Sequence, residues 1–158
     1  MTKIIQKALK VRIYPTKEQS LQINKTIGCC RFFWNNMLGE RKEVYDKLKD
    51  DKEALKKHKF KTEKQWKEEH PFLKEVEAQA LCQTRMDLDN AFNGFFQSQK
   101  KQRKGEELGF PNFKSKRNSK KTYRSPEINN NIRIDYDERV IRMPILKDVK
   151  FRHGSIKE

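Results

Sequence analysis

A basic and aromatic segment carries the clearest chemical signal in this sequence. Residues 99–124 hold ten Lys and Arg but only two acids, and Phe110, Phe113 and Tyr123 lie among them. Ammonium and guanidinium groups neutralise phosphates, and aromatic rings can stack on unpaired bases. The alternative is a solvated basic loop that Phe110 and Phe113 anchor to the core. We expect nucleic-acid contacts from Lys114, Lys116, Arg117, Lys120, Lys121, Tyr123 and Arg124.

The residues needed for acid–base, metal or nucleophilic chemistry do not combine into a site. His58, His70 and His153 are scattered without the spacing of metal ligands. Asp87 and Asp89 stand two residues apart on an expected helix, so they do not share a face. A two-metal nuclease needs several converging carboxylates, and no such set is visible. We therefore expect no catalytic residue, no metal ligand and no cofactor in this chain.

The composition points to a small, strongly basic protein. The chain has 158 residues, of which 34% are hydrophobic, and 37 Lys and Arg against 22 Asp and Glu give a net charge of +15. This predicts one domain with a thin core, with nucleic acid as the default partner and an anionic membrane as the runner-up. No apolar run approaches the ~18 residues of a membrane span. An odd number of cysteines without a disulfide pattern favours the reducing cytoplasm.

Strands are expected at both ends of the chain. Apolar side chains alternate up to Ile13, and Pro15 stops this strand. After Asn129, alternation predicts a hairpin over residues 132–143, and one more strand follows over residues 149–153. A lone strand is not stable by itself, so we expect the first strand to pair with those after residue 129.

Helices are expected between these strands. Thr16 opens a capping-box pattern, which predicts a helix that ends or kinks at Gly28. Apolar residues at three- and four-residue steps predict further helices over residues 30–48 and 74–101. The charged residues 47–69 predict a mobile excursion with one short helix. The cysteines are expected to be small core residues.

This layout predicts an α+β fold in which helices are inserted into a small β-barrel or sheet. The helices on either side of Gly28 suggest a helix-turn-helix, although the turn is shorter than usual. Their polar side suits phosphates and base edges, and equally describes a solvated helix face. From this side we expect contacts by Arg31, Asn35 and Arg41.

Five segments, in order and spacing, resemble the N-terminal half of the TnpB (OrfB) family. Members of that family are transposon-encoded, RNA-guided nucleases related to compact type V CRISPR effectors. Each motif alone is modest, but five in register are specific, and together they extend over nearly the whole chain. The matching segments are residues 7–19, 28–35, 80–96, 109–116 and 129–144.

The resemblance implies a division of the chain. Residues 1–15 would be the first strand of a wedge-type β-barrel, and residues 16–104 a helical recognition domain inserted into it. Residues 105–158 would be a basic connection followed by the remaining wedge strands. The family's RuvC-like nuclease domain and zinc-finger insert come later, so we expect no nuclease centre in this chain.

The resemblance also implies the partners. Wedge and recognition parts of this family hold a guide RNA scaffold and read a short motif in double-stranded DNA beside the target. Gln79, Gln83 and Lys61 are expected on the side of the DNA motif. The missing nuclease domain or a full-length homologue is a further expected partner, and the expected location is the nucleoid of a prokaryotic cytoplasm.

Two other interpretations stay open from the sequence. A stand-alone helix-turn-helix regulator would bind DNA through the helices before residue 50 without RNA. A non-functional transposase remnant or gene fragment would leave an open sheet edge after the last strand and be poorly soluble.

Overall fold

The computed structural model describes residues 10–100 and 108–152, and the chain divides into two compact units. The first, here the sheet unit, comprises residues 1–23 and 127–158. The second, the helical unit, comprises residues 24–126. The start of the predicted first strand, the end of the predicted helix over 74–101 and His153 lie outside the described residues.

Within its described residues, the sheet unit contains four antiparallel strands in the order β1-β4-β3-β2. The predicted pairing of the first strand with those after residue 129 is confirmed, and its partner is the last of them, since Ile13 lies opposite Phe151. The predicted hairpin is also confirmed, and the last strand begins slightly earlier than expected. The bounds are β1 Arg12–Tyr14, β2 Arg133–Asp135, β3 Val140–Met143 and β4 Lys147–Arg152.

The prediction of a barrel is wrong for the described residues, which form an open sheet. The edge strands β1 and β2 have only three residues each, and each pairs with one neighbour. Such short edges do not supply the ladder that would close a barrel. The fold class is therefore α+β with a small open sheet, whose core consists of Leu146, Val149 and Phe151.

The capping box predicted at Thr16 is confirmed. The Thr16 amide donates to Gln19 Oε1 (2.9 Å), and the Gln19 amide donates to Thr16 Oγ1 (3.2 Å). The Gln19 amide nitrogen Nε2 also donates to the carbonyl oxygens of Leu146 and Asp148, at 2.9 Å each. The same side chain thus caps the helix and ties its start to β4.

Helix α1, Lys17–Leu48, is continuous, so the predicted break at Gly28 is wrong. A glycine inside a helix costs only about 1 kcal/mol relative to alanine, which tertiary packing can offset. Here Cys29, Cys30 and Phe33, which lie within five residues after the glycine, are buried in one core. Their burial requires the helix to continue in phase.

Replacing Gly28 with alanine is therefore expected to stabilise the protein. No heavy atom lies within 4 Å of a Cβ placed at Gly28, so the methyl group fits. Removing glycine's extra freedom in the unfolded chain should add about 0.5–1 kcal/mol to the free energy of unfolding. Thermal denaturation followed by circular dichroism measures this. Gly39→Ala, which is equally unobstructed, is the control; a loss at Gly28 beside a gain at Gly39 would contradict a continuous helix.

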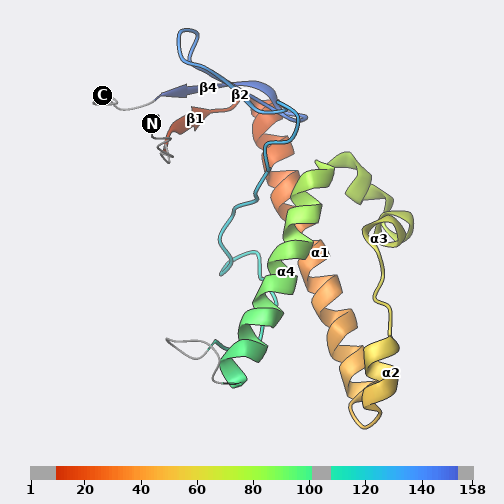
Figure 1. Cartoon of the computed structure of the whole chain (residues 1–158). Coiled ribbons are helices and arrows are strands. Elements are labelled where there is room, and N and C mark those ends of the chain that lie inside the picture. The colour runs from red at the N-terminus through yellow and green to blue at the C-terminus, as the bar shows by residue number, and fades with distance from the viewer. Residues whose placement is uncertain (1–9, 101–107, 153–158) are drawn as a thin grey trace. The chain divides into compact units, whose positions relative to one another are not determined.

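In the part of the helical unit that the structure describes, the rest of α1 is joined by three further α-helices and a 3-10 helix (Figure 1). Two short helices stand where one was predicted. The helix predicted from residue 74 begins four residues later, because Pro71 starts a 3-10 turn there. The bounds are α2 Lys52–Lys57, α3 Glu63–Glu69, η1 Pro71–Glu75 and α4 Ala78–Gln99.

The core of this unit lies between α1 and α4, with α3 and η1 closing one side. The segment predicted to be a mobile excursion is partly packed, because Trp66 of α3 is only 5% exposed. A single tryptophan buries enough area to fix a short helix. The core residues are Cys29, Cys30, Phe33, Trp34, Met37, Leu38, Trp66, Leu73, Val76, Ala80, Leu81 and Leu88.

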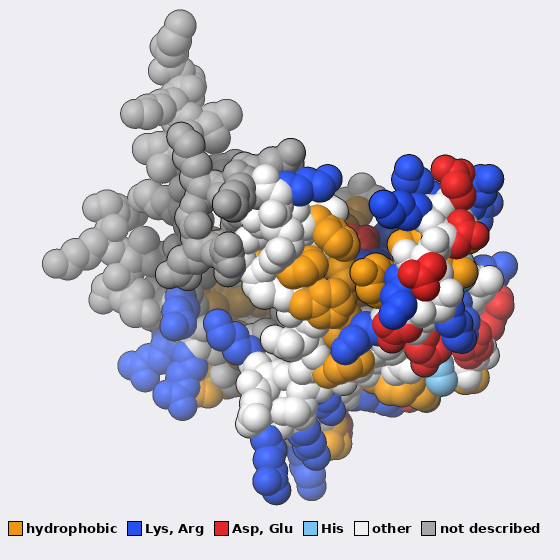
Figure 2. Space-filling view, turned by 90° about the horizontal axis from the view of Figure 1, so that it is seen from below, with side chains coloured by type: hydrophobic (Ala, Val, Ile, Leu, Met, Phe, Trp, Pro, Cys, Tyr) orange, Lys and Arg blue, Asp and Glu red, His pale blue; other side chains and the backbone are white. Residues whose placement is uncertain are grey.

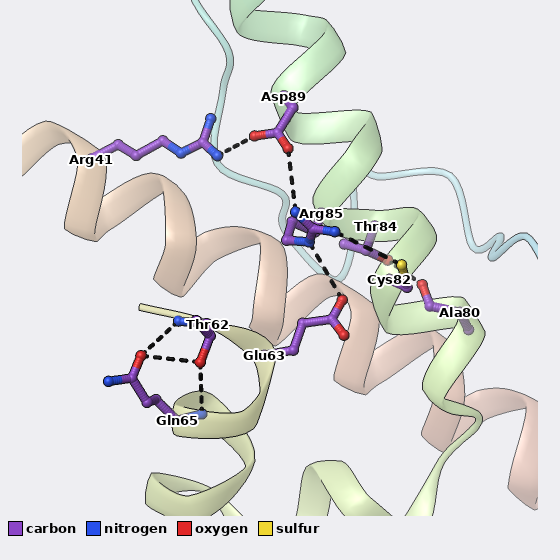
Figure 3. Close-up of polar contacts among 9 residues, drawn as sticks. All are labelled: Arg41, Thr62, Glu63, Gln65, Ala80, Cys82, Thr84, Arg85 and Asp89. Atoms are coloured by element: carbon purple, nitrogen blue, oxygen red, sulfur yellow. Dashed lines mark hydrogen bonds and ion pairs between the residues drawn. The ribbon is translucent and has the colours of Figure 1, made fainter. Parts of the chain in front are cut away.

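A chain of ion pairs links three helices of this unit (Figure 3). Arg41 of α1 pairs with Asp89 of α4. Arg85 of α4 lies 3.9 Å from Asp89 and 3.5 Å from Glu63 of α3. These pairs connect α3 to the pair of helices α1 and α4. None of the helices in residues 10–100 and 108–152 is long and apolar enough to cross a membrane.

Candidate nucleic-acid interface

A groove of about 400 Å³ lies in the helical unit, and we call it the basic groove. α1 and α4 form its floor, and residues 114–124 form its wall. Five of its lining residues are Lys or Arg, and one, Asp87, is acidic. The lining residues are Ile27, Cys30, Arg31, Gln83, Thr84, Asp87, Lys114, Ser119, Lys120, Lys121, Thr122, Tyr123 and Arg124.

The start of this wall is clamped to α1 by side chains that bond its backbone. Asn35 Nδ2 donates to the carbonyl oxygen of Lys114 (2.9 Å), and the Lys114 amide donates to Asn35 Oδ1 (2.8 Å). Trp34 Nε1 donates to the carbonyl oxygen of Asn112 (2.9 Å). The segment has neither helix nor strand here, so these bonds satisfy groups that would otherwise need water.

Lys114 is a half-buried cation. Its Nζ lies 3.8 Å from the centre of the Trp34 ring, in cation–π geometry. Burial lowers the pKa of Lys114, and the nearby Asp87 carboxylate partly opposes that change. An anion bound in the groove would favour the charged ammonium further, because an opposite charge stabilises the protonated form.

The other end of the wall is anchored near α4. Arg124 pairs with Asp87, which also accepts a hydrogen bond from Gln83 Nε2 (3.2 Å). Tyr123 packs against the core, and burial raises its pKa, with Glu77 and Cys30 adding to the effect.

The middle of the wall is exposed. Lys120 and Lys121 make no hydrogen bond or ion pair with any residue in the described part of the chain. Ser119 and Thr122, on either side of them, bring hydroxyl groups to the groove. Hydroxyls commonly donate to phosphate oxygens. These two residues were not predicted, although their position directly before and after a pair of lysines in the sequence is a usable signal.

The structure brings together seven of the predicted contact residues. These are Arg31, Gln83, Lys114, Lys120, Lys121, Tyr123 and Arg124. Lys116 and Arg117 are exposed in the same segment without lining the groove, and Gln79 is half-buried near the start of α4. Asn35 is bonded to the wall itself, as described above.

Arg41 and Lys61 lie apart from the basic groove. Besides its pairing with Asp89, Arg41 lies over the rings of Phe60 (5.5 Å) and Phe92 (4.9 Å). Lys61 pairs with Glu69 (2.7 Å) and lies over Trp66 (4.7 Å). Both side chains thus interact with residues of the helical unit itself. Contact of Arg41 and Lys61 with nucleic acid stays a prediction.

Two of the three cysteines are core residues as predicted, whereas Cys82 is only partly buried. Cys29 and Cys30 are buried free thiols, and burial raises the pKa of each. The Cys30 thiol lies 3.7 Å from the carbonyl oxygen of Ala80, as a weak donor. Within the described residues, no three His, Cys, Asp or Glu side chains are grouped to hold a metal ion.

Comparison with known proteins places these features in context. Residues 1–50 match the family model of the OrfB/IS605 type described as a helix-turn-helix domain. A Streptomyces pristinaespiralis protein named for RNA-guided DNA endonuclease activity is 30% identical over 120 residues, 76% of this chain and 28% of that protein. InsQ of Escherichia coli K12, named likewise, is 28% identical over 153 residues, 93% of this chain and 34% of InsQ. This chain therefore spans about a third or less of either endonuclease.

A shorter relative matches along nearly its whole length. The virulence protein VsdF of Salmonella dublin is 34% identical over 117 residues, 70% of this chain and 93% of VsdF. The region matched by the family model contains β1 and α1. In the described part of that region α1 is one uninterrupted helix, so the turn of the model's name does not lie within residues 17–48.

Proposed function

Since this chain belongs to the OrfB (TnpB) family of transposon proteins and matches the N-terminal part of its members, we propose that the chain binds nucleic acid through the basic groove. The supporting observation is the local charge, with five Lys and Arg against one carboxylate. Lys120 and Lys121 are the central contacts, because they are exposed and unpaired among the described residues. Phosphates would neutralise charges that otherwise repel one another in a chain of net charge +15.

The proposed partners are a guide RNA scaffold and double-stranded DNA beside the target. The names of the two endonuclease relatives support this pair, since both refer to RNA guidance and to DNA. In this proposal the sheet unit is the family's wedge part and the helices of residues 16–104 are its recognition part. Lys116, Arg117, Gln79 and the groove residues contact backbone or base edges.

The proposed role is binding rather than cleavage. The matched family model is a helix-turn-helix domain and not a catalytic one. A nuclease domain or a full-length homologue would supply the cleavage chemistry. The place of action would be the nucleoid of a prokaryotic cell.

Affinity purification of the expressed protein, followed by sequencing of the nucleic acid bound to it, tests this proposal. One abundant structured RNA is the expected result. A specific DNA footprint without RNA would instead support a stand-alone helix-turn-helix regulator, the alternative that the name of the family model favours. Recovery of neither, together with no binding of duplex DNA in a titration at low salt, would overturn the proposal.

A further inference from the structure

The helical unit also has a second groove, which is lined mainly by aromatic side chains. It measures about 600 Å³, and we call it the aromatic groove. Figure 2 shows hydrophobic side chains gathered on one face, with charged side chains of both signs beside them. The groove is lined by Arg41, Lys42, Tyr45, Asp46, Leu55, Phe60, Phe92, Phe95, Phe96 and Phe110.

The rings of this groove hold one another in place. Phe110 meets Phe92 edge to face at 5.3 Å between centroids and Phe95 at 5.4 Å. Phe96 lies 5.3 Å from Phe95 and 6.3 Å from Phe92, yet its side chain stays 53% exposed. A platform with an accessible ring is therefore already formed, so binding of a ligand would not cost the conformational entropy of ordering these side chains.

The edge of the groove carries cations. Arg41 lies 4.9 Å from the Phe92 ring, and Lys42 Nζ lies 5.8 Å from the Phe110 ring. Asp46 is the one acid among the lining residues. The chemistry thus fits a ligand with flat apolar faces and an anionic flank. Arg41 already pairs with Asp89, which leaves Lys42 as the cation available to a ligand. An unpaired nucleotide has both a flat apolar face and an anionic flank, whereas an apolar peptide would offer Lys42 no anionic partner.

The aromatic groove is also connected to the basic groove by the chain itself. Phe110 lines the former and Lys114 lines the latter, four residues further on. Four residues span at most about 14 Å. One bound strand can therefore engage both grooves along this segment.

We propose that the aromatic groove stacks the unpaired bases of single-stranded nucleic acid, with Phe96 as the exposed platform. This inference rests on the proposed function, because it assigns the basic groove to the phosphates of the same strand. Bases stack on aromatic rings with little dependence on sequence, so the groove would select single strands over duplexes.

Phe96 variants test this inference with the full chain. The probes are a fluorescein-labelled single strand of about 10 nucleotides, the same strand carrying 2-aminopurine, and a blunt DNA duplex. Phe96→Ala is expected to weaken single-strand binding by about fivefold or more and to abolish quenching of 2-aminopurine. Phe96→Tyr should retain both, while Phe96→Leu, which keeps apolarity without a ring, should lose the quenching. Duplex binding should not change.

Phe72→Ala is the matched control, because Phe72 is a partly exposed phenylalanine outside the groove. Unchanged single-strand affinity and quenching in Phe96→Ala, with duplex binding intact, would overturn the stacking role while leaving the proposed function standing. A lower molecular mass of Phe96→Ala in sedimentation, with unchanged oligonucleotide binding, would overturn it in favour of self-association. Absence of binding to every probe by the wild type would overturn the proposed function itself.

Discussion

Replacing Lys120 and Lys121 together with alanine is expected to weaken binding to duplex DNA and to make the remaining binding less sensitive to salt. Each phosphate neutralised by Lys or Arg contributes about 0.9 to the slope of log affinity against log salt concentration on B-form DNA. Losing two contacts should flatten that slope by about 1.8 and weaken binding by roughly tenfold to a hundredfold at low salt. Fluorescence anisotropy of a labelled duplex across a salt series measures both.

Lys56 and Lys57 provide the matched control for this experiment. They are adjacent, exposed lysines on α2, outside the basic groove. Their double replacement removes the same charge from the chain. An equal loss in both double variants would mean that binding follows net charge and not the groove. A flat salt response of the wild type would contradict phosphate binding altogether.

The features predicted correctly from the sequence depend on neighbours along the chain. Thr16 and Gln19 are three residues apart, and their capping contacts need only the first helical turn. Lys120 and Lys121 were predicted from local charge density. The fold brings these lysines to the same groove as Arg31, and this proximity could not be predicted from local sequence. Their exposure could be predicted, because a run of basic residues stays exposed in almost any fold.

The features that were missed depend on distant contacts. Helix continuity at Gly28 comes from the burial of the residues after it, which local propensity does not encode. The sheet is open because the edge strands β1 and β2 do not pair with each other. The alternation of apolar and polar residues predicts a strand, but it does not predict whether the edges of the sheet pair to close a barrel. Asn35 bonds a backbone 79 residues away, and no sequence pattern links these positions. Because Asn35 is a polar residue on a helix face, the sequence indicated a contact with a ligand. The structure shows a different role as well, in which Asn35 holds the wall of the basic groove against α1.

Replacing Asn35 with alanine is expected to destabilise the protein and release the wall of the basic groove. The substitution leaves the half-buried N–H and C=O of Lys114 without their partners, at a cost of about 2 kcal/mol. The melting temperature should fall by about 5 °C. Amide hydrogen exchange over residues 112–116 should accelerate, because that backbone loses its anchor. Nucleic-acid affinity should fall as a secondary effect of the displaced Lys114.

Asn36→Ala separates this clamp from a general effect of removing an asparagine. Asn36 Nδ2 donates to the carbonyl oxygen of Phe32 (2.8 Å) within the same helix and not to the wall. This variant should leave exchange over residues 112–116 unchanged. If Asn35→Ala lost affinity at unchanged stability and exchange, Asn35 would contact nucleic acid directly and the clamp would carry little energy. If Asn35→Ala lost stability first, the polar atoms of Asn35 would serve the groove by holding Lys114, and affinity would recover at temperatures where the wall stays docked.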